Sequence, residues 1–336
     1  MSLRVGIVGL PNVGKSTLFN ALLKKQQAYA ANFPFATIEP NVGIVPVPDY
    51  RLERLAQIVG ADLHGPLPPI VPATVEFVDI AGLVAGASKG EGLGNKFLAH
   101  IREVDAIIHV VRAFEDADII RSGSVDPKSD LEIVKTELDL ADLETMERAK
   151  GKAERGKGGN GNEGMPFLFK YKPLLVVLNV DEDRLKEASK LEEMFASEVG
   201  LEKDQVIAIS AKTESELAAL SEEDAKLYLS DLGVEQSGLE RLIKKAFATL
   251  GLITFLTAGV KEVRAWTLRA GTDALRASGT IHTDFMDKFI KAEVVNFEDF
   301  VTCGGWKKSR ELGKARLEGR DYIVKDGDVV EFKIGS

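Results

Sequence analysis

The sequence has only one cysteine, Cys303, among 336 residues. A single cysteine excludes an intramolecular disulfide framework and fits a reducing compartment. No neighbouring residue would activate a thiolate, so we expect a small, partly buried side chain. The sequence also lacks an apolar run of the roughly 20 residues that a bilayer span needs, and its first residues show neither the apolar core nor the cleavage site of a signal peptide. We therefore expect a cytoplasmic protein that does not enter a membrane.

Positive charge is also in short supply. Lys and Arg number 43 against 52 Asp and Glu, which gives a formal net charge of -9. This balance argues against attraction of nucleic acid to the whole surface, because binding to a polyanion needs clustered cations. A local basic run remains in WKKSRELGKARLEGR, residues 306–320. It is either a phosphate-binding patch or a solvated helix face.

Short strands rich in Val and Ile alternate with amphipathic stretches through most of the chain. This order predicts an α/β fold with a mainly parallel sheet and helices on both faces. At 130–155 the pattern becomes a long amphipathic helix, read as an exposed or paired arm rather than a core helix. A flexible glycine-rich tip follows, GKGGNGNEG at 156–164. From about 252 the segments shorten and suggest a small α+β domain, with Asp326-Gly327 as a hairpin turn between two alternating runs.

The stretch GLPNVGKS, residues 9–16, matches the pattern G-x-x-x-x-G-K-[ST] between a predicted strand and a predicted helix. Glycines let backbone amides surround phosphates, the helix N-terminus adds its positive end, and the lysine reaches the terminal phosphates. The strand-to-helix context disfavours a mere glycine turn. The candidate nucleotide-binding residues here are Asn12, Val13, Gly14, Lys15, Ser16 and Thr17, and the Ser16 hydroxyl is also a candidate Mg²⁺ ligand.

Two further segments complete a candidate Mg²⁺ and terminal-phosphate site. Asp79 ends the predicted strand VEFVDIAG and can hold Mg²⁺ through water, while the Gly82 amide can bind a terminal phosphate. Thr37, in FPFATIEPN, can complete the Mg²⁺ shell. Leu83 occupies the position where Ras-like GTPases carry a glutamine that orients the attacking water. Hydrolysis must therefore be slow or be positioned by another group.

Together these motifs resemble the YchF or Obg-like ATPase family of P-loop NTPases. The resemblance covers essentially the whole chain and rests on GLPNVGKST, FATIEPN, DIAGLVAGASKGEGLGNKF, GTIHTDF and EGRDYIVKDGDVVEF. It implies a G domain at 1–129 and 171–251, an inserted helical arm at 130–170, and a C-terminal TGS domain, which is ubiquitin-like, at 252–336 with its preceding linker. It also implies ATP hydrolysis and association with ribosomal RNA and proteins. Leu83 agrees with the family's replacement of the catalytic glutamine by a hydrophobic residue.

The sequence departs from this family in two places. The family's arm is usually a longer helical hairpin than 130–170 allows. Relatives also carry a histidine after an FED segment, proposed to aid hydrolysis, whereas AFEDADIIRSGSVDP has Arg121 near that position. Of the four histidines, His109 lies in an apolar strand and is expected to be structural, and His64, His100 and His282 have no partner that indicates catalysis. We assign no general base.

The base-binding segment LLVVLNVDED, residues 174–183, ends where regulatory GTPases carry Asn-Lys-x-Asp. A carboxylate accepts from guanine N1–H and its 2-amino group, but it would face a lone pair at adenine N1. Here Val180 replaces the lysine and Glu182 replaces the aspartate, while Asn179 can both donate and accept, which suits adenine. The loop at Ser210 and Ala211 resembles the one that backs the base in G domains. The alternative reading is a polar strand end without a role.

Three functions remain open from the sequence. The first is a monomeric, Mg²⁺-dependent ATPase that prefers ATP over GTP and acts as a slow switch on the ribosome. The second is an Obg-type GTPase. The third is a nucleotide-gated binding module with negligible turnover, which Leu83 and the missing histidine make credible.

Overall fold

The computed structural model describes residues 3–32, 41–63, 66–80, 93–115, 126–154 and 168–335. The chain divides into two compact units, one of 1–45 and 75–249 and the other of 46–74 and 250–336. The boundary at 249/250 lies close to the predicted start of the C-terminal domain. Residues 46–74, assigned from the sequence to the first part of the G domain, instead cluster with the C-terminal residues. Thr37 and Asp79 are thus joined in sequence by a segment of the second unit.

The first unit is built on a six-stranded sheet with the order β2-β4-β1-β5-β6-β7. Strands β4, β1, β5, β6 and β7 pair in parallel, which confirms the predicted α/β class. Strand β5 is buried along its whole length, as expected for a central strand covered on both faces. The strands are β1 (Arg4–Gly9), β2 (Val42–Pro46), β4 (Thr74–Asp79), β5 (Ala106–Arg112), β6 (Leu174–Asn179) and β7 (Val206–Ile209).

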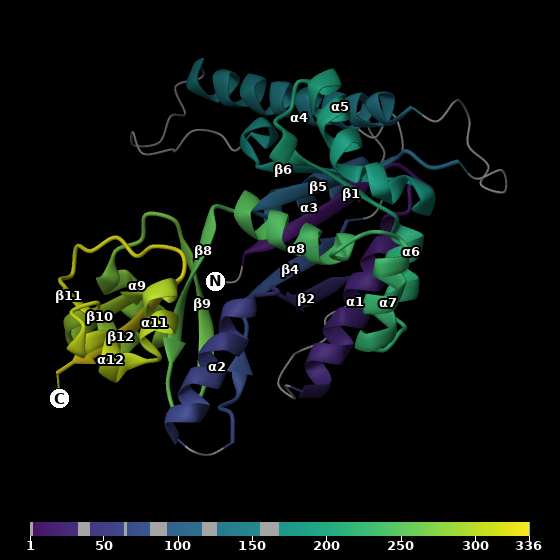
Figure 1. Cartoon of the computed structure of the whole chain (residues 1–336). Coiled ribbons are helices and arrows are strands. Elements are labelled where there is room, and N and C mark those ends of the chain that lie inside the picture. The colour runs from purple at the N-terminus through teal and green to yellow at the C-terminus, as the bar shows by residue number, and fades with distance from the viewer. Residues whose placement is uncertain are drawn as a thin grey trace. The chain divides into compact units, whose positions relative to one another are not determined.

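Helices cover both faces of this sheet. One face packs against α3, α4 and α5, and the opposite face packs against α1 and α8 (Figure 1). The helices of the unit are α1 (Lys15–Asn32), α3 (Leu93–Glu103), α4 (Pro127–Glu154), α5 (Ala188–Val199), α6 (Ala211–Leu217), α7 (Glu222–Asp231) and α8 (Gly238–Thr249). The described residues also form the short 3-10 helices η2 (Phe169–Tyr171), η3 (Glu182–Glu187) and η4 (Lys203–Gln205).

Helix α4 differs from the predicted arm. Leu131, Val134 and Ala141 are buried in the core clusters on one face of the sheet. The buried Asp142 accepts hydrogen bonds from the backbone amides of Phe169 (2.7 Å) and Lys170 (3.0 Å). For this part of the helix the expectation of an exposed arm is therefore wrong, because its apolar stripe packs on the sheet rather than on a partner helix. The glycine-rich tip lies outside the described residues.

The second unit contains a mixed sheet with the order β11-β10-β12-β8-β9-β3. Antiparallel pairs join β8 to β9 and β10 to both β11 and β12, whereas β12 pairs in parallel with β8 and β3 with β9. The predicted small α+β domain is thus confirmed. Its strands are β3 (Ile70–Val71), β8 (Leu252–Ala258), β9 (Val263–Arg269), β10 (Phe289–Asn296), β11 (Arg316–Glu318) and β12 (Asp328–Ile334). Its helices are α2 (Tyr50–Leu63), α9 (Ala274–Ile281), α10 (Thr283–Asp287), α11 (Phe297–Cys303) and α12 (Trp306–Glu311).

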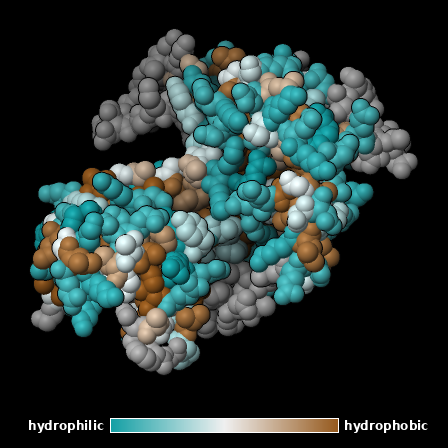
Figure 2. All heavy atoms as spheres, viewed as in Figure 1, coloured by the Kyte–Doolittle hydropathy of each residue, from teal (hydrophilic) through white to brown (hydrophobic). Residues whose placement is uncertain are grey.

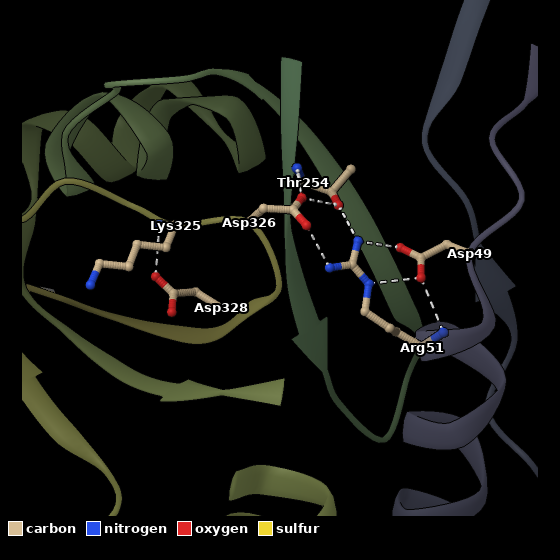
Figure 3. A network of polar contacts seen from close by, with 6 residues as sticks. All are labelled: Asp49, Arg51, Thr254, Lys325, Asp326 and Asp328. Carbon is tan, nitrogen blue, oxygen red and sulfur yellow. Dashed lines mark hydrogen bonds and ion pairs between the residues drawn. The ribbon is translucent and has the colours of Figure 1, made fainter. Parts of the chain in front are cut away.

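A polar network attaches α2 to the C-terminal sheet within this unit (Figure 3). The Arg51 guanidinium donates to both Asp49 carboxylate oxygens, to an Asp326 oxygen and to the Thr254 hydroxyl, each at 2.8 Å. Burial alone would lower the pKa of Arg51, but the hydrogen bonds to Asp49 and Asp326 raise it above its ordinary value. The guanidinium therefore stays charged and joins residues that are far apart in the sequence.

The same network explains why Asp326-Gly327 forms a turn but not the predicted hairpin. Only β12 follows the turn as a strand, and before it Ile323 makes a single bridge to Asp273. Asp326 accepts from the Thr254 amide at 2.9 Å, and the Gly327 amide donates to the Thr254 carbonyl at 2.9 Å. These bonds hold the segment against β8 as a loop, which the alternating pattern did not reveal.

Replacing Arg51 with alanine is expected to destabilise the second unit by about 2–3 kcal/mol. This is less than for a fully buried pair, because Asp326 is half exposed, but Asp49 would remain largely buried without its partner. Both tryptophans, Trp266 and Trp306, belong to this unit, so their fluorescence during urea unfolding reports on it. Arg54→Ala is the control, because Arg54 is exposed on the same helix and its guanidinium donates to Gln57 rather than to this network. Equal midpoints for the two variants would contradict the role of the network.

Some large apolar side chains are exposed at the surface. On the face seen in Figure 2, apolar residues lie among hydrophilic ones over the second unit. Leu312 and Leu317 are examples of large exposed apolar residues of the second unit. Cys303 is buried, as predicted. Among the described residues, no helix combines the length and apolar character needed to cross a bilayer.

Candidate functional site

A pocket of about 1130 Å³ lies at the carboxyl ends of the parallel strands of the first unit. It is lined by the loops that follow β1, β5, β6 and β7. Parallel strands place these ends at the same edge of the sheet, where open α/β sheets bind ligands. The volume is at the upper end of the roughly 300–1,000 Å³ typical of small-molecule sites.

The loop between β1 and α1 has the geometry of a phosphate cradle. Asn12 and Gly14 both have positive φ, 63° and 91°, so the backbone adopts the left-handed region at both positions of this short loop. A Cβ on Gly9 would lie 2.7 Å from the carbonyl oxygen of Val110, so only glycine allows β1 to approach β5 so closely. Val13 is fully buried and anchors the loop, while Asn12, Ser16 and Thr17 are exposed at the pocket.

Replacing Gly14 with alanine is expected to weaken nucleotide binding at least tenfold, or about 1.4 kcal/mol. The new Cβ would lie 2.1 Å from Nδ2 of Asn179, so that side chain would have to move, and the positive φ adds strain. Titration with a fluorescent ATP analogue measures the effect. Gly200→Ala is a matched control, since Gly200 also has positive φ (70°) but no atom within 4 Å of an added Cβ. Equal losses in both variants would contradict the steric argument.

Lys15 and Asp79 are brought together at the base of the phosphate loop. The Lys15 ammonium lies 2.5 Å from an Asp79 carboxylate oxygen, and both side chains are largely buried. Ser16 follows Lys15 in the sequence and lies in the first turn of α1. The Asp79 carboxylate and the Ser16 hydroxyl supply oxygen atoms, which are the ligands that Mg²⁺ prefers. The other predicted members, Thr37 and Gly82, lie outside the described residues, as does Leu83.

Asn179 links the phosphate loop to the loop after β7. Its side chain is 5% exposed, its Nδ2 donates to the Val13 carbonyl, and its Oδ1 accepts from the Ala211 amide, both at 2.9 Å. Ser210 is the N-cap of α6, and its hydroxyl accepts from the Thr213 amide at 3.4 Å. Asn179 thus fixes the loops that surround the pocket, in addition to lying in its wall.

The two altered positions of the base motif have different surroundings. The Val180 side chain is 3% exposed and belongs to a core cluster, and its amide donates to the Ile209 carbonyl at 2.9 Å. It therefore stabilises the loop. Glu182 lines the pocket, but its Oε2 accepts from the Thr213 hydroxyl at 3.0 Å and from the Tyr228 hydroxyl at 2.9 Å. The carboxylate is directed to α6 and α7.

Sequence reasoning missed several residues of the site. Thr213 follows the predicted Ser210 loop by only one helical turn and could have been included on that ground. Tyr228 gave no local signal, because 46 positions separate it from Glu182. Phe114 and Glu115 line the pocket after β5. The Glu115 amide donates to Asp181 at 3.1 Å and so links this loop to the base loop. Phe114 and Glu115 could both have been predicted because they follow the apolar strand in AIIHVVRAFE.

His109 is buried in β5, and burial lowers its pKa to about 4. It is neutral at physiological pH, in agreement with the expected structural role. The residue near the family's proposed histidine, Arg121, lies outside the described residues.

The basic run at 306–320 is largely compensated by acidic neighbours. Arg310 pairs with Glu293 and with Glu331, at 2.8 and 2.9 Å. Lys314 pairs with Asp299, and Arg316 with Glu318. Lys307 and Lys308 are exposed, and within the described part of the chain neither has an ion-pair partner. The run is thus neither a continuous cationic patch nor one helix face.

Known proteins match this chain over both units. Residues 4–148 match the model of a family described as "50S ribosome-binding GTPase", and residues 252–335 match "YchF-GTPase_C", described as a protein of unknown function. The chain is 47% identical to the "Ribosome-binding ATPase YchF" of Haemophilus influenzae and 46% identical to that of Bacillus subtilis, with 99% of each chain covered.

The structural comparison gives the same result over both units. A solved structure of the Schizosaccharomyces pombe YchF GTPase matches with a TM-score of 0.83 and 33% identity, and 99% of this chain and 98% of that chain are covered. Both the sequence relatives and this solved structure extend over nearly the full length. The chain therefore belongs to the YchF family.

Proposed function

We propose that the chain binds ATP with Mg²⁺, prefers ATP over GTP, hydrolyses it slowly to ADP and phosphate, and associates with the ribosome as a cytoplasmic, monomeric switch. The observation that carries the base preference is the direction of the Glu182 carboxylate, whose Oε2 is hydrogen bonded to Thr213 and Tyr228. The names of the relatives from H. influenzae and B. subtilis, ribosome-binding ATPases, support the activity and the partner.

The phosphate loop supports triphosphate binding. Asn12, Val13, Gly14, Lys15, Ser16 and Thr17 supply backbone amides, the ammonium group and hydroxyls at the N-terminus of α1. In this proposal Ser16 and Asp79 hold Mg²⁺, with Thr37 completing its shell and Gly82 contacting the terminal phosphate. The ion would neutralise charge on the phosphates.

The base region favours adenine. Asn179 uses Oδ1 and Nδ2 to fix the surrounding loops, so we propose that it positions the adenine-binding backbone of Val180, Ser210 and Ala211 rather than acting alone. A free carboxylate is the group that recognises guanine, and Glu182 is engaged elsewhere. Slow hydrolysis follows from Leu83, which cannot orient water.

Phosphate release and ribosome co-sedimentation test this function together. We expect the purified chain to release phosphate slowly from ATP, to do so faster with ribosomes, and to sediment with them. Release from GTP exceeding release from ATP by about tenfold would contradict the proposal, as would failure to sediment with ribosomes in ATP, in ADP and without nucleotide. Lys15→Ala measures the background from contaminating ATPases.

Lys307 and Lys308 are proposed to contact ribosomal RNA phosphates, since their charges are not compensated by the acidic groups that pair with Arg310. The variant with both lysines replaced by alanine is expected to bind ribosomes more weakly and with a salt slope smaller by about 2, because each lysine would no longer neutralise one phosphate. Co-sedimentation across a salt series measures the slope. Lys128→Ala is the control, because Lys128 is exposed in the first unit. An unchanged slope would remove these residues from the interface.

An Obg-type GTPase is the second candidate. It is favoured by the retained asparagine of the base motif, Asn179, and by the S. pombe relative, which is named a YchF GTPase. A nucleotide-gated module without turnover is the third, favoured by Leu83. The base preference distinguishes the GTPase from the ATPase. Phosphate release distinguishes the module without turnover from both enzymes.

A further inference from the structure

The carboxylate of Glu182 is held by two hydroxyl groups that come from different helices. Thr213 belongs to α6 and donates at 3.0 Å, while Tyr228 belongs to α7 and donates at 2.9 Å, both to Oε2. Thr213 also contacts the Ser210 hydroxyl at 3.0 Å. The arrangement ties Glu182 to helices that border the pocket rather than to the loop that carries it.

Tyr228 has a second carboxylate within reach. Its hydroxyl lies 3.4 Å from Glu216, compared with 2.9 Å from Glu182. A phenol has one proton to donate, and the shorter distance assigns that proton to Glu182. The hydrogen bond to Glu182 is the main reason that the pKa of Tyr228 is raised to about 12. Tyr228 is therefore a donor throughout the physiological range.

Recognition of guanine requires a carboxylate that accepts from N1–H and from the 2-amino group. Glu182 lines the pocket and follows Asn179 at the spacing of the guanine-reading aspartate, so its identity alone does not exclude this role. The observation against this role is that Oε2 of Glu182 is hydrogen bonded to Thr213 and Tyr228. Hydrogen bonds to charged acceptors are among the stronger ones in proteins, and turning Glu182 toward a base would break two of them.

We propose that Tyr228 and Thr213 are positioning residues that set the base preference by holding the Glu182 carboxylate away from the guanine-recognising position. This inference rests on the proposed function, because it requires that the pocket bind a purine nucleotide with ATP preferred. It adds two residues on α6 and α7 to the determinants of specificity, neither of which belongs to the base motif.

The test uses Tyr228→Phe, Thr213→Val and the double variant, which remove the hydroxyls and keep the shape. Affinities for ATP, GTP and ITP are measured with Mg²⁺. We expect the ratio of GTP to ATP affinity to rise about threefold in Tyr228→Phe and at least tenfold in the double variant. The gain for ITP should be smaller, since inosine lacks the 2-amino group. Adding Glu182→Gln to the double variant should abolish the gain.

Tyr171→Phe is the matched control, because Tyr171 is an exposed tyrosine of the same unit outside the pocket. Its affinity ratio should equal that of the wild type. A ratio within twofold of wild type in both Tyr228→Phe and the double variant would overturn the inference, as would a gain that persists with Glu182→Gln. Tyr228→Phe alone keeps the test valid if the buried Thr213 substitution impairs folding. A wild-type chain that prefers GTP would instead refute the proposed function.

Discussion

Replacing Lys15 with alanine should weaken ATP binding about 100-fold, or roughly 2.7 kcal/mol. Lys15 is the cation of the phosphate loop, and hydrogen bonds to charged groups contribute about 1.5–3 kcal/mol each. Its ammonium lies 2.5 Å from Asp79, so it is already positioned at the proposed Mg²⁺ site. Removing it would take away the phosphate contact and would also leave Asp79 without its counter-ion. Isothermal titration with ATP and Mg²⁺ measures the loss.

Lys128→Ala is the matched control for this substitution. It removes an equal charge from an exposed position of the first unit, where Lys128 lies 3.8 Å from Glu198, and it should leave ATP affinity within twofold of wild type. If Lys15→Ala bound ATP within threefold of wild type, the phosphate loop would not be the site of nucleotide binding.

Replacing Asn179 with alanine should destabilise the first unit by about 2–4 kcal/mol. The substitution leaves the Val13 carbonyl and the Ala211 amide without their partner, and a buried unsatisfied group costs about 1–3 kcal/mol. In a unit of this size each kcal/mol lowers Tm by about 2–4 °C. We therefore expect Tm to fall by roughly 4–16 °C and ATP affinity to fall as well, since both loops around the pocket lose their common anchor.

Circular dichroism during heating measures the change for Asn179→Ala. Asn20→Ala provides the comparison, because Asn20 is exposed on α1. Its loss should lower the free energy of unfolding by less than one hydrogen bond contributes, about 1 kcal/mol. An Asn179 variant that melts with the wild type would show that the two hydrogen bonds do not hold the pocket together.

The geometry of the loop at 9–16 could be predicted from the sequence because its determinants are local. The residues from Gly9 to Ser16 are contiguous, and the positive φ of Gly14 and the approach of Gly9 to β5 are what their spacing implies. The parallel sheet followed in the same way from the alternation of apolar strands with helices. The mainly parallel first sheet and the α+β character of the C-terminal residues both agree with prediction.

Contacts between distant segments were not predictable. Nothing near Glu182 indicates that Tyr228 would hold its carboxylate, and nothing near Arg51 indicates a bond to Asp326. The same limit explains two errors. The stripe of Leu131, Val134 and Ala141 gives the same periodicity on a sheet as on a partner helix, and the alternation around Asp326-Gly327 does not show that the turn binds Thr254.

The competition between ATP and GTP for the wild-type chain in the presence of Mg²⁺ tests the central claim most directly. The account predicts that ATP displaces a fluorescent nucleotide at a concentration at least tenfold lower than GTP does, a difference of about 1.4 kcal/mol or more. Displacement by GTP at a concentration tenfold lower than that of ATP would show that the pocket prefers guanine, and would contradict the account.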